Sequence, residues 1–109
     1  MSCSVSEFVE IPGASGASYR FRRLEGPTRL PATAGNFIFS RSGPEGVAVI
    51  CCGAVSSLLL AADTWRAAVA EHQADRIYVR LNVSRAVRTA EHEDIVARQA
   101  PLLIVVDPK

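Results

Sequence analysis

The chain lacks a long apolar run and lacks a secretory signal. Hydrophobic residues make up 49% of its 109 residues, yet no segment approaches the roughly eighteen uninterrupted apolar residues of a membrane span. The first ten residues, MSCSVSEFVE, contain neither a positively charged start nor an apolar core of secretory length. The sequence therefore predicts a cytoplasmic protein that does not partner with a membrane.

An excess of either charge is also missing. Twelve Lys and Arg residues oppose eleven Asp and Glu residues, which leaves a formal net charge of +1. A strongly basic or acidic chain would indicate a nucleic acid, a membrane surface or an acidic partner as a whole-molecule preference. Because that preference is absent, electrostatic recognition has to be local. The length fits one globular domain with a hydrophobic core.

Cysteine and histidine are scarce. The three cysteines are Cys3, Cys51 and Cys52, and their odd number predicts free thiols. The last two are neighbours in an apolar run, so in a strand their side chains point to opposite faces. Only His72 and His92 remain as further soft ligands, and the spacing of a zinc site is missing. From these residues we expect no cofactor.

The most informative stretch runs from Gly35 to Gly53 and reads GNFIFSRSGPEGVAVICCG. Two runs rich in β-branched and aromatic residues, 36–39 and 47–51, flank the turn-forming segment SRSGPEG. This pattern predicts a β-hairpin at the centre of a sheet, joined by a loop longer than a tight two-residue turn. Alternation places Phe37 and Phe39 on one face of the first arm.

The two ends of the chain differ in character. Residues 1–17 end in IPGASGAS, whose small residues, Gly and Pro predict a flexible lead-in. We therefore expect a single domain over residues 18–109. At the other end, LLIVVDPK predicts a strand that ties the C-terminal segment into the fold.

The segment SYRFRRL at 18–24 alternates between rings and guanidinium groups. It predicts a short strand with Tyr19 and Phe21 on one face and Arg20 and Arg22 on the other. Arginine interleaved with aromatic residues is typical of nucleic-acid surfaces, because arginine pairs with phosphate and rings stack on bases. The alternative is an edge strand that its charges keep soluble.

Two helices are predicted, one on each side of a further strand. The first follows Ser56 or Ser57, and its apolar stripe is expected to face the sheet at Leu58, Ala62, Trp65 and Val69. The second, SRAVRTAEHEDIVARQ, begins after Asn82 or Ser84 and ends near Pro101. Its predicted apolar side consists of Ala86, Val87, Ala90 and Ala97.

Between the helices, RIYVRLN at 76–82 alternates cleanly. The inward residues are expected to be Ile77, Val79 and Leu81. The opposite face carries a polar row made of Arg76, Tyr78, Arg80 and Asn82. This row is either a solvated face of an antiparallel sheet or a row that faces a ligand.

Two carboxylates lie on the predicted apolar side of the second helix. Asp94 falls in its middle and Glu91 at its edge. Local pairs of Asp94 with Arg98 and of Glu91 with Arg88 are one explanation. The other is a carboxylate that faces a cleft, where it binds a metal ion or accepts a proton.

Three segments occur in a recognisable order over residues 19–103. They are Gly35-Asn36-Phe37-Ile38-Phe39, the run Val49-Ile50-Cys51-Cys52-Gly53 before a helix, and the acidic helix with its Pro-Leu ending, AEHEDIVARQAPLL. In this order and spacing the chain resembles a GIY-YIG nuclease domain. The resemblance implies an α+β fold in which helices flank a small central antiparallel sheet.

The resemblance also implies which residues would carry the chemistry. In the family, tyrosine helps to activate water, a helix arginine steadies the phosphate and a helix glutamate holds one divalent metal ion. Here Phe37 stands at the first tyrosine position and Ile50 or Val49 at the second. The first cation of the following helix, Arg66, comes too late in that helix. Only Glu91 keeps its place, as the candidate metal ligand.

The main hypothesis is therefore a GIY-YIG-like domain that has lost nuclease activity and keeps a binding role for DNA or RNA. Its predicted nucleic-acid-binding residues are Arg76, Tyr78, Arg80, Arg20 and Arg22. One alternative is a divergent endonuclease that uses Mg²⁺ or Mn²⁺, with catalytic residues Tyr78, Arg80 and Glu91. The other is a protein-interaction or structural module, which needs no charged row.

Overall fold

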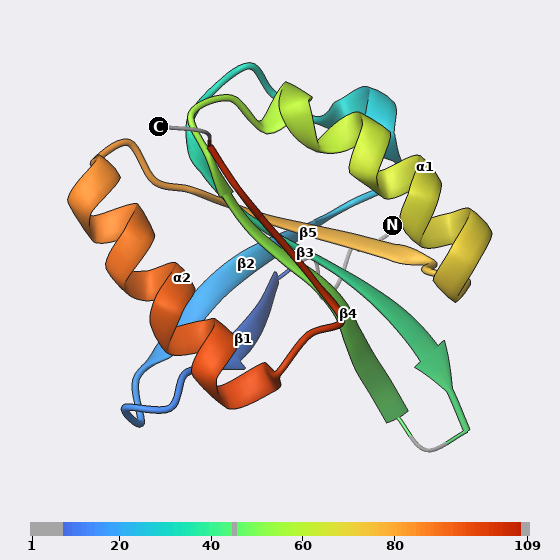
Figure 1. Cartoon of the computed structure of the whole chain (residues 1–109), viewed down its shortest axis with the longest axis horizontal. Helices are drawn as coiled ribbons and strands as arrows, with labels where there is room; N and C mark the ends of the chain where they lie inside the picture. Colours follow the sequence, from blue (N-terminus) through green and yellow to red (C-terminus); the bar gives the residue numbers. More distant parts are fainter. Residues whose placement is uncertain (1–7, 45, 108–109) are drawn as a thin grey trace, which may run out of the picture.

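A computed structural model of the chain describes residues 8–44 and 46–107. In this part of the chain, six strands form one sheet and two α-helices lie on its opposite faces (Figure 1). The strands are Phe8–Pro12 (β1), Ser18–Leu24 (β2), Gly35–Gly43 (β3), Gly46–Val55 (β4), Arg76–Leu81 (β5) and Leu103–Val106 (β6). The helices are Ala61–His72 (α1) and Arg85–Gln99 (α2), and short 3₁₀ turns span Pro27–Arg29 and Leu58–Leu60. Neither α-helix is long and apolar enough to cross a membrane.

The predicted hairpin is present and central. Strand β3 pairs with β4 on one side and with β5 on the other, both antiparallel. The ladder between β3 and β4 continues to the pair Gly43 and Gly46, with a register shift after Phe39. The expected long loop is therefore wrong, because most of its residues extend the two strands instead.

The sheet is mixed rather than wholly antiparallel. Its order is β1-β2-β5-β3-β4-β6, and β6 runs parallel to β4. The expected C-terminal strand is confirmed, but the expected antiparallel sheet is wrong at this edge. The chain reaches the edge only after crossing the sheet through α2, and a parallel neighbour needs such a crossover.

The N-terminal part of the described chain belongs to the sheet. Strand β1 pairs antiparallel with β2, and its Val9 and Ile11 pack against the core on the α2 side. The flexible lead-in expected over residues 1–17 is therefore wrong for residues 8–17, while residues 1–7 lie outside the described part. Strand β2 lies between β1 and β5, so it is not an edge strand.

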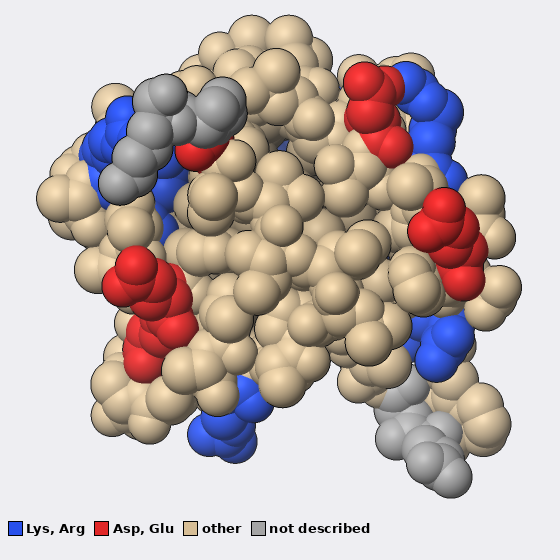
Figure 2. Space-filling model, viewed as in Figure 1, with Lys and Arg blue, Asp and Glu red and all other residues tan. Residues whose placement is uncertain are grey.

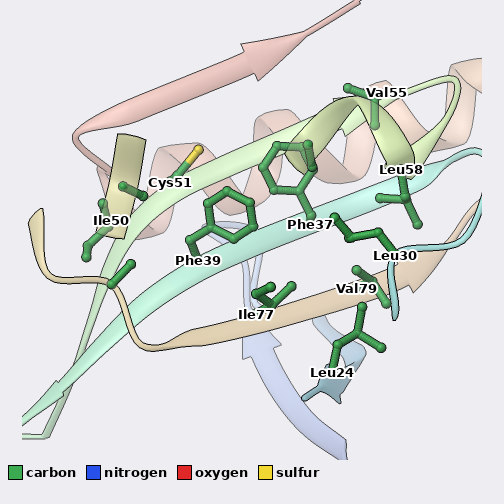
Figure 3. Close-up of a cluster of buried hydrophobic side chains, with 13 residues drawn as sticks. Leu24, Leu30, Phe37, Phe39, Ile50, Cys51, Val55, Leu58, Ile77 and Val79 are labelled. Atoms are coloured by element: carbon green, nitrogen blue, oxygen red, sulfur yellow. The ribbon is translucent and has the colours of Figure 1, made fainter. Parts of the chain in front are cut away.

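The larger core cluster lies between the sheet and α1 (Figure 3). The rings of Phe37 and Phe39 have centroids 4.8 Å apart, and Trp65 meets Phe39 edge-on at 5.0 Å. The helix faces the sheet with Ala61 and Ala68, which are buried, whereas Val69 is 42% exposed. The predicted stripe is confirmed at Leu58, which belongs to this cluster, and at Ala62 and Trp65, which pack against it, and it is wrong at Val69.

The second cluster lies between the sheet and α2 and contains Phe21, Ile38, Cys52, Tyr78 and Ile95. Ser84 caps this helix as predicted, because its Oγ accepts a hydrogen bond from the Val87 nitrogen. The predicted apolar side is wrong. Its residues Ala86, Val87, Ala90 and Ala97 are exposed, and the helix instead buries Arg88, His92 and Ile95.

The adjacent cysteines lie on opposite faces of β4, as predicted. Cys51 belongs to the cluster under α1 and Cys52 to the cluster under α2. Both are free and buried, and burial raises the pKa of each thiol to about 12. Both thiols are therefore protonated near neutral pH. Cys3 lies outside the described residues.

Gly53 provides a direct test of the α1-side core. It faces Phe37 across the β3–β4 ladder, and an added Cβ would collide with the Phe37 ring. We expect Gly53→Ala to lower the free energy of unfolding by about 1–3 kcal/mol through overpacking. The control is Gly26→Ala, where a Cβ meets nothing within 4 Å. Equal unfolding free energies for both variants in urea titrations would contradict this packing.

Candidate functional site

The polar row of β5 lies under α2. Arg76, Tyr78 and Arg80 share one face, as the alternation predicted, but that face is the one that packs on the helix. Tyr78 is 5% exposed and packs with Ile95 of α2. Arg76 lies beside Asp75 at 3.9 Å. The solvated-face hypothesis is therefore wrong for Tyr78, because a helix covers it.

Arg80 and Glu91 come together, in a closed polar network. Arg80 donates to both Glu91 oxygens, from Nε at 2.8 Å and from Nη2 at 3.3 Å. Asn82 donates to the same carboxylate at 2.8 Å and to Asn36 Oδ1 at 2.9 Å. Asn36 in turn donates to the Arg88 carbonyl at 3.1 Å. The network joins β3 and β5 to α2.

This network supports a structural role for the residues of the nuclease alternative. Both oxygens of Glu91 already accept hydrogen bonds, and its charge is balanced by Arg80. Within the described residues, no group of three or more His, Cys, Asp or Glu side chains is placed to hold a metal ion. The expected local pair of Glu91 with Arg88 does not form, because Arg88 donates to the carbonyls of Asn82 and Val83.

Asp94 fixes the turn between β1 and β2 to α2. Its carboxylate accepts from the Ser15 nitrogen at 2.8 Å, from Ser15 Oγ at 2.7 Å and from the Tyr19 hydroxyl at 2.7 Å. The Asp94 carbonyl accepts from the Ala14 nitrogen. Hydrogen bonds from Ser15 and then Tyr19 lower the pKa of Asp94, and the bond to Asp94 is the main cause that raises the pKa of Tyr19. Among the described residues Asp94 forms no pair with Arg98.

The opposite face of the sheet carries an open basic pocket. Helix α1 packs mainly over β3 and β4, and beyond it on this side Arg20, Arg22 and Leu81 are exposed. A pocket of about 470 Å³ lies there. We call it the arginine pocket, and its lining consists of Phe8, Arg20, Arg22, Leu24, Arg29, Pro31, Val79, Arg80 and Leu81.

The arginine pocket combines cationic groups with an apolar floor. Arg20 and Arg22 point away from Tyr19 and Phe21, as the alternation of SYRFRRL predicted. The lining holds no carboxylate, and in the described chain Arg20, Arg22 and Arg29 make no ion pair. Such a pocket can hold an anionic ligand that also has a flat apolar part.

Two residues of this pocket escaped the sequence reasoning. Phe8 lies in the segment assigned to the lead-in, and its ring centroid is 4.3 Å from the Arg20 guanidinium carbon. Arg29 lies in the proline-rich connection between β2 and β3. The signal that could have found Phe8 is the short alternation FVEIP at 8–12, with two β-branched residues, Val9 and Ile11, on one face.

A second pocket, of about 250 Å³, lies between α2 and the end of β6. Its lining mixes both signs of charge, with Arg85 and Arg88 beside Glu93 and Asp107. His92 also lines it, and burial lowers the pKa of this imidazole. Because the charges oppose one another, this pocket shows no preference for an anion.

No known family model, curated protein or solved structure matches the chain. The geometry of the arginine pocket therefore carries the functional interpretation.

The contact between Arg80 and Glu91 can be measured by a double-mutant cycle. We expect Glu91→Ala to lower the free energy of unfolding by about 1–3 kcal/mol, because it leaves Arg80 and Asn82 without their acceptor. The coupling energy with Arg80→Ala should reach about 1 kcal/mol. The exposed pair of Asp63 and Arg66 on α1 is the matched control, with a coupling of a few tenths of a kcal/mol. A similarly small coupling for Arg80 and Glu91 would show that the network does not hold α2.

The pKa of Asp94 predicts an acid-dependent contribution to stability. Since the folded-state pKa is lowered, this contribution is complete above the unfolded value of about 3.9 and is lost as the pH falls through the folded value. Asp94→Asn should remove that part of the pH dependence from unfolding curves recorded at acidic pH. Glu93→Gln, an exposed change on the same helix, should keep it. If the parent and Asp94→Asn curves stay parallel, the contacts with Ser15 and Tyr19 do not influence folding.

Proposed function

We propose that this protein is a nucleic-acid-binding domain without nuclease activity, and that the arginine pocket is its binding site. The observation that carries the proposal is the open pocket in which Arg20, Arg22 and Arg29 surround an apolar floor without a carboxylate. The proposal keeps Arg20 and Arg22 from the sequence hypothesis. It replaces Arg76 and Tyr78 of β5, which do not line the pocket, with Arg29 and Phe8.

The chemistry of the pocket suits a single strand. Guanidinium groups pair with phosphate in a planar, two-pronged geometry. Phe8 is 49% exposed, so its ring can stack on a base, an interaction that contributes about 1–3 kcal/mol per base. The floor formed by Leu24, Val79 and Leu81 offers further apolar surface. In a duplex the base faces are already stacked, so a single strand is the preferred ligand.

The proposed loss of catalysis agrees with a diverged GIY-YIG-like domain. Three contiguous antiparallel strands, β5, β3 and β4, lie at the middle of the sheet and helices flank them. At the positions of the family tyrosines, Phe37 and Ile50 are buried, and neither they nor Val49, the alternative at the second position, has a hydroxyl. Glu91 is held by Arg80 and Asn82. These features support a diverged domain that binds nucleic acid without cutting it.

Titration of labelled oligonucleotides tests this function. With about three phosphate contacts, affinity for a single strand should fall about 20-fold between about 50 and 200 mM NaCl, because counterions are released on binding. The double variant Arg20→Ala with Arg22→Ala should bind more weakly, and the slope of log affinity against log salt should become shallower by about 1.4. Fluorescence anisotropy with single- and double-stranded probes provides the measurement.

The control variant is Arg76→Ala, which removes the same charge from an arginine that does not line the pocket. Its affinity should equal that of the parent. The same oligonucleotides should stay intact during incubation with Mg²⁺ or Mn²⁺. Binding that the double variant retains, or binding that Arg76→Ala loses equally, would reject the arginine pocket as the site. Metal-dependent cleavage abolished by Glu91→Ala would favour the endonuclease alternative.

A further inference from the structure

Strand β6 forms an open edge of the sheet. It is the outermost strand next to β4, so along its other side its backbone N–H and C=O groups have no neighbouring strand within the described residues. Its sequence, Leu103–Val106, is LIVV, which combines high β propensity with no charge. Such an edge is a template for another strand.

The side chains of β6 add exposed apolar surface to this edge. Ile104 pairs with Cys52 and Val106 with Ala54, which places both on the face of the sheet that α2 covers, since Cys52 belongs to that cluster. Ile104 is 54% exposed and Val106 is 56% exposed. Leu102, directly before the strand, is 68% exposed.

The middle of the surface over β6 is free of charge, whereas Arg85, Glu93 and Asp107 lie beside the end of the strand at Val106. In the view of Figure 2, charged side chains of both signs lie around the rim, and the centre, over which β6 runs in Figure 1, is uncharged. An uncharged centre with a charged rim is typical of a protein interface. A partner that covers it must itself be uncharged at the centre, because burying an unpaired charge there would be costly.

The two edges of the sheet differ in their protection. Strand β1, at the other edge, carries the exposed Glu10 and ends at Pro12. Charge and proline both discourage pairing with a further strand. Strand β6 contains neither a charged residue nor a proline. The β1 edge is therefore protected against pairing with another strand, and the β6 edge is not.

We propose that β6 pairs with β6 of a second copy of this chain, and that the protein is a homodimer. A second copy presents the same uncharged surface, so it is a partner without charge at the centre of the interface. A two-fold axis then closes the assembly, because both copies contribute identical surfaces. An antiparallel pair around an axis normal to the sheet keeps each side chain on its own face. With Val105 on the axis, Ile104 of each copy lies opposite Val106 of the other, and both exposed positions are covered.

The dimer requires a modest part of the surface. A specific interface buries about 800 Å² per partner, roughly one eighth of the 6306 Å² accessible surface of this chain. Four paired residues do not reach that area, so the uncharged surface on both sides of β6 completes the contact. The two α2 helices then lie on the same face of a joined sheet.

Sedimentation equilibrium over a range of concentrations tests the assembly. The parent should sediment as a dimer, and Ile104→Lys and Val106→Glu should each sediment as a monomer. Both positions are more than half exposed, so each variant should keep the circular dichroism spectrum and urea midpoint of a folded chain. If either one unfolds, Ile104→Thr, which keeps β propensity with less apolar surface, should still raise the dissociation constant at least tenfold.

Mixing the two charged variants tests the register. In a mixed dimer, Lys at position 104 of one copy faces Glu at position 106 of the other, and the remaining pair is apolar. The mixture should therefore form heterodimers while each variant alone stays monomeric. The control is Leu81→Lys, at an exposed apolar position on β5, which β3 and β4 separate from β6 in the sheet. This variant should remain a dimer.

Two results would overturn the proposal. One is a monomeric parent at every concentration up to about 0.5 mM, well above the micromolar dissociation constants of weak standard-size interfaces. The other is a dimer that survives both Ile104→Lys and Val106→Glu. Single variants that are monomeric alone and stay monomeric on mixing would reject the Val105 register.

Discussion

The polar network centred on Glu91 determines how the two faces of the sheet are used. Glu91 accepts hydrogen bonds from Arg80 and Asn82, which hold α2 against β5. Asn36 donates a hydrogen bond to the Arg88 carbonyl, which holds the start of the helix against β3. The network holds Arg80, whereas Arg76 of the same row lies beside Asp75. The arginines that line an open pocket, Arg20, Arg22 and Arg29, lie on the opposite face.

The parts of the fold that could be predicted are those that short-range patterns dictate. Phe37 and Phe39 alternate with Asn36 and Ile38, and that period alone places them on the two faces of β3. A local hydrogen bond to Ser84 starts α2, so its beginning could be read from the sequence. Likewise the alternation of SYRFRRL identified Arg20 and Arg22 as a pair on one face, and both line the pocket.

The parts that could not be predicted depend on partners far away in the sequence. The helical wheel placed the apolar side of α2 on its alanines, but an alanine buries little surface, and Ile95 together with the polar network decides the orientation. Arg88 is buried where Asn36 of β3, 52 residues away, donates a hydrogen bond to its carbonyl and the carbonyls of Asn82 and Val83 accept from its guanidinium. Phe8 became part of the site only because β1 pairs with β2.

The order of the strands places the two proposed surfaces at opposite ends of the sheet. The arginine pocket lies over β1, β2 and β5 at one end of the sheet, and β6 forms the other end. Pairing through β6 would leave both pockets open, at the two outer ends of a continuous sheet. Each pocket offers only a few phosphate contacts and so a modest affinity. Two pockets on one rigid dimer would bind one long nucleic-acid strand together. Once the first pocket is bound, the second pocket meets the same strand at a high effective concentration. A small domain with nearly balanced charge could in this way bind an extended nucleic acid tightly while each site alone stays weak.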